Sequence, residues 1–102
     1  MAIAWQELQQ RYDALSEQLV NPDLDAQKRQ ELQKEHSYLA TLLSKHRTIT
    51  ELNAAIADLE QQAQTADDPE YASMCHEEIA SLKADVQAAH NALDDILFPP
   101  VP

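Results

Sequence analysis

The only cysteine of the chain, Cys75, is followed at once by His76 and then by two glutamates. A cysteine and a histidine can form a thiolate–imidazole pair, which activates the sulfur as a nucleophile when the two side chains face each other. Neighbouring residues of a helix point about 100° apart, so Cys75 and His76 would not meet on a helix. We therefore predict that Cys75 is an unreactive side chain of the core.

A metal site requires several imidazole, thiolate or carboxylate ligands close together. The four histidines are His36, His46, His76 and His90, and no two of them are four residues apart. His76 and His90 share a helical phase but would lie about 21 Å apart along a helix, too far to share one ion. The sequence therefore predicts no metal ion and no other cofactor.

Neighbouring carboxylates occur three times and are candidates for acid–base catalysis. The pairs are Asp67 and Asp68, Glu77 and Glu78, and Asp94 and Asp95. Such catalysis needs a cleft in which the two carboxyl groups have different environments, and a slim helical domain offers none. The chain also has no glycine, so it contains neither a phosphate-binding loop nor a dinucleotide-binding fingerprint. We expect that this chain alone is not an enzyme.

The composition indicates one small all-α domain. The chain has 102 residues, and good helix formers dominate. Without glycine, turns that need positive φ are costly, so long helices with few turns are expected. There is no signal-peptide pattern and no internal disulfide, and no apolar run approaches the roughly 20 residues of a membrane span. A cytoplasmic protein without a membrane partner is the default expectation.

The charge is distributed unevenly along the chain. Residues 1–47 carry seven acids and six bases, whereas residues 48–102 carry eleven acids and only Lys83. Proteins that bind nucleic acids usually present a basic patch, so we expect no direct nucleic-acid binding. The second half would suit a basic protein surface as its partner. A solvated acidic surface without a partner is the alternative.

Apolar residues at alternating spacings of three and four predict three helices, at about residues 3–20, 24–65 and 69–98. The seam of the first helix is Trp5, Leu8, Tyr12, Leu15 and Leu19, and that of the third is Cys75, Ile79, Leu82, Val86, Ala89, Leu93 and Ile96. The second segment begins with Leu32, Leu39 and Leu43, and a cleaner series follows, Tyr38, Leu42, Lys45, Ile49, Leu52, Ile56, Leu59, Ala63 and Ala66. Lys45 breaks this series, because its side chain is charged. We expect the second segment to form one long helix. A bend or break would fall near residues 44–50, where helix propensity is low.

Two turns separate these helices. Asn21-Pro22-Asp23 ends the first helix and caps the second, while Asp67 and Asp68 are predicted caps before Pro69. The expected architecture is an elongated three-helix bundle with a long antiparallel helical hairpin. The short first helix lies against one end of the hairpin through its Trp5 and Tyr12 face. Residues 1–98 form this domain, and the proline-rich residues 99–102 begin an interdomain linker.

Three stretches carry a family resemblance. They are Asn-Pro-Asp-Leu-Asp-Ala-Gln-Lys-Arg-Gln-Glu-Leu-Gln-Lys-Glu-His-Ser-Tyr-Leu (21–39), Asp-Pro-Glu-Tyr-Ala-Ser-Met-Cys-His-Glu-Glu (68–78) and Ile-Leu-Phe-Pro-Pro-Val-Pro (96–102). In order and spacing they resemble the N-terminal domain of bacterial class I peptide chain release factors, most closely the type that reads UAA and UAG. The resemblance covers roughly residues 8–102. Tyr71 departs from it, since the family often has methionine there.

The resemblance implies a role in translation termination on the ribosome. In that family a Gly-Gly-Gln loop promotes peptidyl-tRNA hydrolysis, and a chain without glycine cannot contain it. This chain would be a non-catalytic arm that contacts the GTPase-associated region of the large ribosomal subunit or the recycling GTPase release factor. Glu77, Glu78 and Asp85 are the expected contact residues. The alternative is a free-standing three-helix interaction protein or chaperone cofactor.

Overall fold

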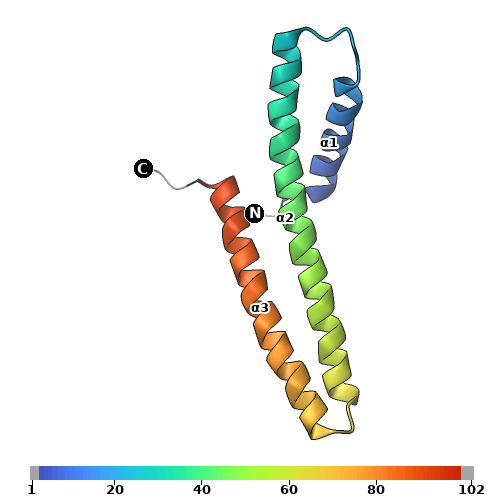
Figure 1. Cartoon of the computed structure of the whole chain (residues 1–102), viewed down its shortest axis with the longest axis vertical. Coiled ribbons are helices and arrows are strands. Elements are labelled where there is room, and N and C mark those ends of the chain that lie inside the picture. Colours follow the sequence, from blue (N-terminus) through green and yellow to red (C-terminus); the bar gives the residue numbers. More distant parts are fainter. Residues whose placement is uncertain (1–2, 100–102) are drawn as a thin grey trace. The chain divides into compact units, whose positions relative to one another are not determined.

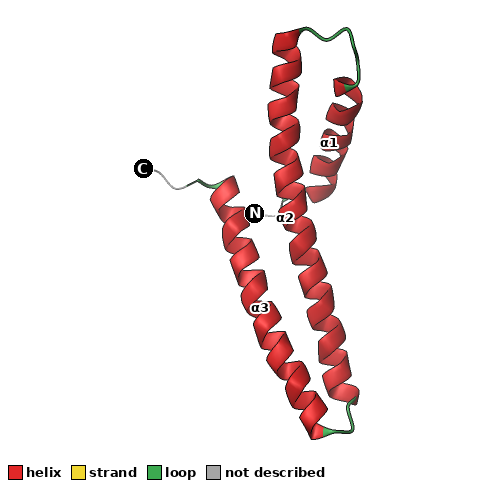
Figure 2. Cartoon of the chain, in the orientation of Figure 1, coloured by secondary structure: helices red, strands yellow, loops and turns green. Residues whose placement is uncertain are grey.

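The computed structural model describes residues 3–99, and this part of the chain contains three α-helices and no strand (Figures 1 and 2). The helices are α1 (Trp5–Leu19), α2 (Ala26–Thr65) and α3 (Pro69–Leu97). The all-α class predicted from the sequence is confirmed. The chain divides into two compact units, Met1–Ser44 and Lys45–Pro102, and α2 contributes to both. The single domain over residues 1–98 stays a prediction. The predicted linker lies outside the described residues except for Pro99.

In the first unit, α1 packs against the first part of α2 (Figure 1). The buried side chains of this unit are Leu15, Leu32, Leu39 and Leu42. The ring of Tyr12 stacks on His36 with the ring centroids 4.3 Å apart, and Ser16 Oγ lies 2.9 Å from His36 Nε2. The predicted Tyr12 face of α1 is therefore the face that contacts α2.

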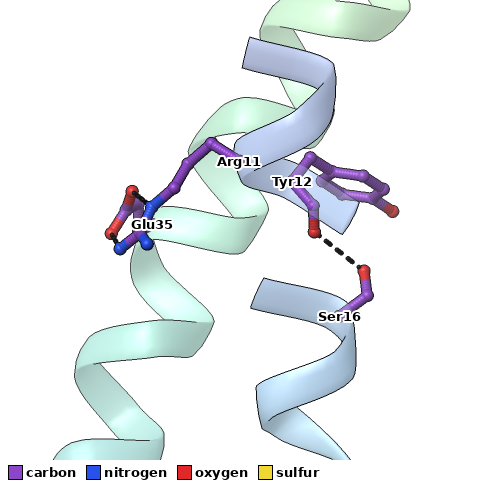
Figure 3. A network of polar contacts seen from close by, with 4 residues as sticks. All are labelled: Arg11, Tyr12, Ser16 and Glu35. Atoms are coloured by element: carbon purple, nitrogen blue, oxygen red, sulfur yellow. Dashed lines mark hydrogen bonds and ion pairs between the residues drawn. The ribbon is translucent and has the colours of Figure 1, made fainter. Parts of the chain in front are cut away.

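An ion pair joins the same two helices at their surface (Figure 3). Arg11 Nε donates to Glu35 Oε2 at 2.7 Å and Arg11 Nη2 donates to Glu35 Oε1 at 2.9 Å. The hydrogen bond from Arg11 is the main cause that lowers the pKa of the Glu35 carboxyl. Both side chains are partly exposed, so water screens the pair and its contribution to stability is small.

The turn between α1 and α2 is held by side chains. Arg29 of α2 donates to the backbone carbonyls of Leu19 and Asn21, at 2.7 Å in both cases. It so satisfies one acceptor at the end of α1 and one in the turn. Asp25 Oδ1 accepts from Lys28 N at 2.7 Å. Asp25 therefore caps α2, and this is why the helix begins at Ala26 rather than near residue 24. No described residue has positive φ.

The predicted place of Tyr38 in the apolar seam is wrong. Tyr38 is 46% exposed, whereas Leu39 and Leu42 are buried. One partner helix covers only a narrow stripe, and here the stripe follows Leu32, Leu39 and Leu42. Tyr38 lies about 100° round the helix from Leu39, which places it toward solvent.

In the second unit, the second part of α2 and the whole of α3 run antiparallel, joined by a short turn (Figure 1). The predicted helical hairpin is confirmed. Its buried residues come from both predicted seams and are Ile49, Ile56, Cys75, Ile79 and Leu93. α2 is one helix of 40 residues that runs through residues 44–50 without interruption. The boundary between the two units falls beside Lys45, in the segment of low helix propensity.

The start of α3 follows the predicted signal only in part. Asp68 is the N-cap residue, Pro69 is the first helical residue, and Asp68 Oδ1 accepts from Glu70 N at 3.0 Å. Asp67 lies one residue before the cap position. A helix has a single N-cap position, so the prediction holds for Asp68 but not for Asp67.

Replacing the capping carboxylate tests this assignment. We expect Asp68→Ala to lower the free energy of unfolding by about 1 kcal/mol, because Glu70 N would lose its acceptor. Asp67→Ala removes the same charge one residue earlier and is the matched control, with an expected change within about 0.5 kcal/mol. Urea denaturation followed by circular dichroism measures both. Equal losses for the two variants would contradict the assignment.

Candidate protein-interaction site

The cysteine and the histidine that raised the question of chemistry lie on different sides of α3. Cys75 is buried in the seam, whereas His76 is exposed. The prediction that they do not pair is consistent with this arrangement. Within residues 3–99, no group of three His, Cys, Asp or Glu side chains is placed to hold a metal ion. No helix in the same range is long and apolar enough to span a membrane.

The three acids predicted to contact a partner, Glu77, Glu78 and Asp85, are all exposed on α3. Glu78 and Asp85 are seven residues apart and therefore share one face of the helix, about 10 Å apart along its axis. Glu77 points about 100° away from Glu78. Glu78 and Asp85 can therefore contact the same partner surface, whereas Glu77 faces a different direction.

An open groove lies between the two helices of the second unit, near the turn that joins them. It has a volume of about 230 Å³, and we call it the tip groove. Leu59 comes from α2, and Tyr71, Met74, Cys75 and Glu78 come from α3. Four of the five side chains are mainly apolar and one is a carboxylate. The lining of the groove therefore suits an apolar side chain that has a positively charged group next to it.

A hydrogen-bonded chain fixes one wall of the tip groove. The Tyr71 hydroxyl donates to Gln62 Oε1 at 2.5 Å, and Gln62 Nε2 donates to Asp58 Oδ2 at 2.8 Å. The amide of Gln62 thus connects α3 with an acid one turn back along α2. The electrostatic interaction with Cys75 is the main cause that raises the pKa of the Tyr71 phenol. Partial desolvation, a hydrogen bond with Cys75 and the charge of Asp58 raise this pKa further.

This arrangement predicts the titration of Tyr71. Because the folded state holds the phenolic proton more tightly, the stabilising contribution is fully present below pH 10 and is lost as the pH rises through the folded pKa. The difference between the ultraviolet titrations of the wild type and Tyr71→Phe isolates this phenol. We expect a midpoint above the ordinary value of 10.0. A midpoint at or below that value would contradict the packing of Tyr71 against Cys75.

Sequence reasoning missed the apolar part of this site. Met74 stands one residue before Cys75 and outside the regular seam, yet it is apolar and 65% exposed. An apolar residue outside the seam was the one feature of the sequence that could have indicated an exposed apolar surface here. The groove itself could not be recognised before α2 and α3 were paired, because Leu59 is twelve residues or more from every other lining residue.

Comparison with known proteins identifies the family. The profile of the PCRF domain matches residues 8–102, which is nearly the whole chain. The chain belongs to the PCRF domain family. This agrees with the range over which the sequence resembles class I peptide chain release factors, and that resemblance is confirmed.

Several proteins named peptide chain release factor 1 are relatives of this chain. The protein of Treponema denticola is 31% identical over 97 residues, which cover 93% of this chain and 27% of the relative. The protein of Syntrophobacter fumaroxidans is 29% identical over 92 residues, which cover 88% of this chain and 26% of the relative. The protein of Chlamydia pneumoniae is 35% identical over 71 residues, which cover 70% of this chain and 20% of the relative. The chain thus spans about a quarter of the length of the curated relatives it matches. No solved structure matches it.

Proposed function

We propose that this chain is the N-terminal helical domain of a class I peptide chain release factor and acts in translation termination on the ribosome. The observation that carries the proposal is the PCRF domain match over residues 8–102, together with relatives named peptide chain release factor 1 that align over 93% of the chain. By the same likeness, the whole factor would read UAA and UAG and work in the cytoplasm.

The role proposed for this chain is positional rather than catalytic. The longer factor would promote hydrolysis of peptidyl-tRNA through a Gly-Gly-Gln loop, and residues 1–102 contain no glycine. In residues 3–99 the structure offers a buried thiol and exposed acids, without a group of side chains arranged to hold a metal ion. In this proposal the domain contributes contacts that hold the factor in place, while another part of the factor performs the chemistry.

The proposed partners are the GTPase-associated region of the large ribosomal subunit and the recycling GTPase release factor. The exposed acids Glu77, Glu78 and Asp85 support a partner with a basic protein surface. The balance of eleven acids against Lys83 in residues 48–102 supports a protein contact rather than a nucleic-acid contact, since phosphates would be repelled.

Peptide release from stalled ribosomes tests the function. The chain is added to ribosomes that hold labelled peptidyl-tRNA at a UAA codon, alone and in competition with a full-length factor of the family. We expect no release by the chain alone and weak inhibition of the full-length factor. Release by the chain alone would overturn the positional role. No effect in either measurement would favour the free-standing interaction protein.

A charge-reversal variant tests the contact residues in the same assay. Replacing Glu77, Glu78 and Asp85 by lysine should abolish the inhibition at low salt, because the attraction to a basic surface is lost. Replacing Glu7, Glu17 and Glu31 by lysine changes the net charge equally and is the matched control, since these acids are exposed in the first unit. Equal losses for the two variants would show a dependence on net charge alone and would refute the assignment to α3.

A further inference from the structure

We infer that the tip groove binds a lysine- or arginine-rich protein segment that inserts one apolar side chain beside Tyr71 and Met74. This inference deepens the proposed function, on which it rests, by naming the chemistry of the partner segment. Three features of the groove support it: the exposure of its apolar side chains, the charge around them and the fixed position of its wall.

The apolar side chains of the groove are more exposed than folding alone requires. Met74 is 65% exposed and Tyr71 is 45% exposed, and both lie in the first turns of α3. Single exposed apolar residues are normal, but here two of them line one concave surface together with Leu59 and Cys75. A partner that covers them would bury apolar surface that now contacts water, which favours binding.

The charge around the groove selects the partner. Residues 48–82 contain eight acids and neither lysine nor arginine. Glu78 lines the groove itself, and Asp58 is linked to its wall through Gln62. The tip groove of a second copy would bring the same negative charge and be repelled, whereas a cationic segment would be attracted. The complementary occupant is therefore a basic segment with an apolar anchor.

The groove is also prepared for binding. The hydrogen bonds from Tyr71 to Gln62 and from Gln62 to Asp58 hold the tyrosine ring across the two helices. Cys75 is buried behind it and is part of the packed seam. Both hydrogen bonds lie at an exposed surface, so they favour this position of the ring without locking it, and they lower only part of the conformational entropy lost on binding.

The test uses a fluorescent lysine-rich helical peptide with one central leucine as the probe, and anisotropy with the whole chain as the readout. Two comparison peptides replace the leucine by alanine or all lysines by glutamate. We expect the probe to bind, the alanine peptide to bind about tenfold more weakly, and the glutamate peptide not to bind. Raising the salt concentration should weaken the charge contribution but not the contribution of the leucine.

Protein variants then locate the site. Met74→Gln should weaken binding of the probe about tenfold, because glutamine is similar in length and in helix propensity but is polar. Val20→Gln makes the same kind of change at an apolar residue that is 81% exposed in the first unit, and should change affinity less than about twofold. With the alanine peptide, Met74→Gln should cause no further loss, since the two changes remove the same contact.

Several results would overturn this inference. Equal affinity for the probe and the glutamate peptide would remove the charge argument, and equal effects of Met74→Gln and Val20→Gln would remove the groove. Self-association of the chain that is abolished by Met74→Gln would identify a second copy as the occupant instead. Inhibition on the ribosome that survives Met74→Gln would refute the groove and leave the proposed function standing. Probe binding without any ribosome effect would refute the function and leave the groove standing.

Discussion

Replacing Leu15 by alanine is expected to lower the free energy of unfolding by about 3 kcal/mol. Leu15 is 0% exposed and lies four residues before the end of α1, and the other buried residues of the first unit are leucines of α2. Alanine would leave a cavity, and the surrounding side chains could refill it only in part. Urea denaturation followed by circular dichroism gives the change in free energy.

Two further measurements make this result specific. Val20→Ala removes apolar atoms from a side chain that is 81% exposed, so it should change stability by no more than about 0.5 kcal/mol. In Leu15→Ala, hydrogen exchange should accelerate most in Trp5–Leu19, because α1 depends on this contact. A loss below about 1 kcal/mol, or exchange unchanged in α1, would show that Leu15 does not anchor the helix.

Replacing Ile79 by alanine should have an effect of similar size, about 3 kcal/mol, on the second unit. Ile79 is 6% exposed and lies four residues after Cys75 on the buried seam of α3. A pair of helices has few buried side chains, so the loss of one branched residue removes a large part of the contact. The expected readout is a lower urea midpoint with faster exchange of amide protons in Pro69–Leu97.

Met74→Ala is the matched control for Ile79→Ala. It shortens an apolar side chain on the same helix, five residues earlier, but on the exposed side. Stability should change by no more than about 0.5 kcal/mol. If Met74→Ala destabilised the chain as much as Ile79→Ala, the methionine would be a core residue and its exposure would need another explanation.

Spacing alone predicted much of the helical framework. On α3, the residues Cys75, Ile79 and Leu93 are buried, and the intervening seam positions Leu82, Val86 and Ala89 are half-buried. Three- and four-residue spacings are a local property of the chain, so they can be read without knowing the partner helix. The start of α3 was predictable for the same reason, because Asp68 and Pro69 act on their own helix.

Features that depend on a partner helix were not predictable. Tyr38 continues an apolar spacing but is exposed, because the width of the buried stripe depends on the helix that covers it. Nothing in the sequence predicts a contact for His36, yet its ring stacks on the ring of Tyr12 and lies within hydrogen-bonding distance of Ser16. Asp25 was missed as a cap because other polar residues stand in the same turn and the choice among them depends on backbone geometry.

The candidate site shows the same division. The exposed acids could be proposed from charge and helical phase, and the structure places Glu78 and Asp85 on one face of α3. Whether they contact a partner stays a prediction. The tip groove could not be derived, since Leu59 comes from α2 and meets Tyr71 and Met74 only after the hairpin has formed.

The two turns also determine where the chain can accept a cysteine that carries a spectroscopic label. No residue in the described range has positive φ, so no position in either turn meets the steric cost that a side chain has in the left-handed region. The turns are held by a small set of side-chain contacts from Asn21, Asp25, Arg29 and Asp68. Cysteines for spectroscopic labels can therefore be introduced at the neighbouring exposed position Asp23 and at Asp67 without backbone strain, and a probe at either site would report on the motion of its own unit.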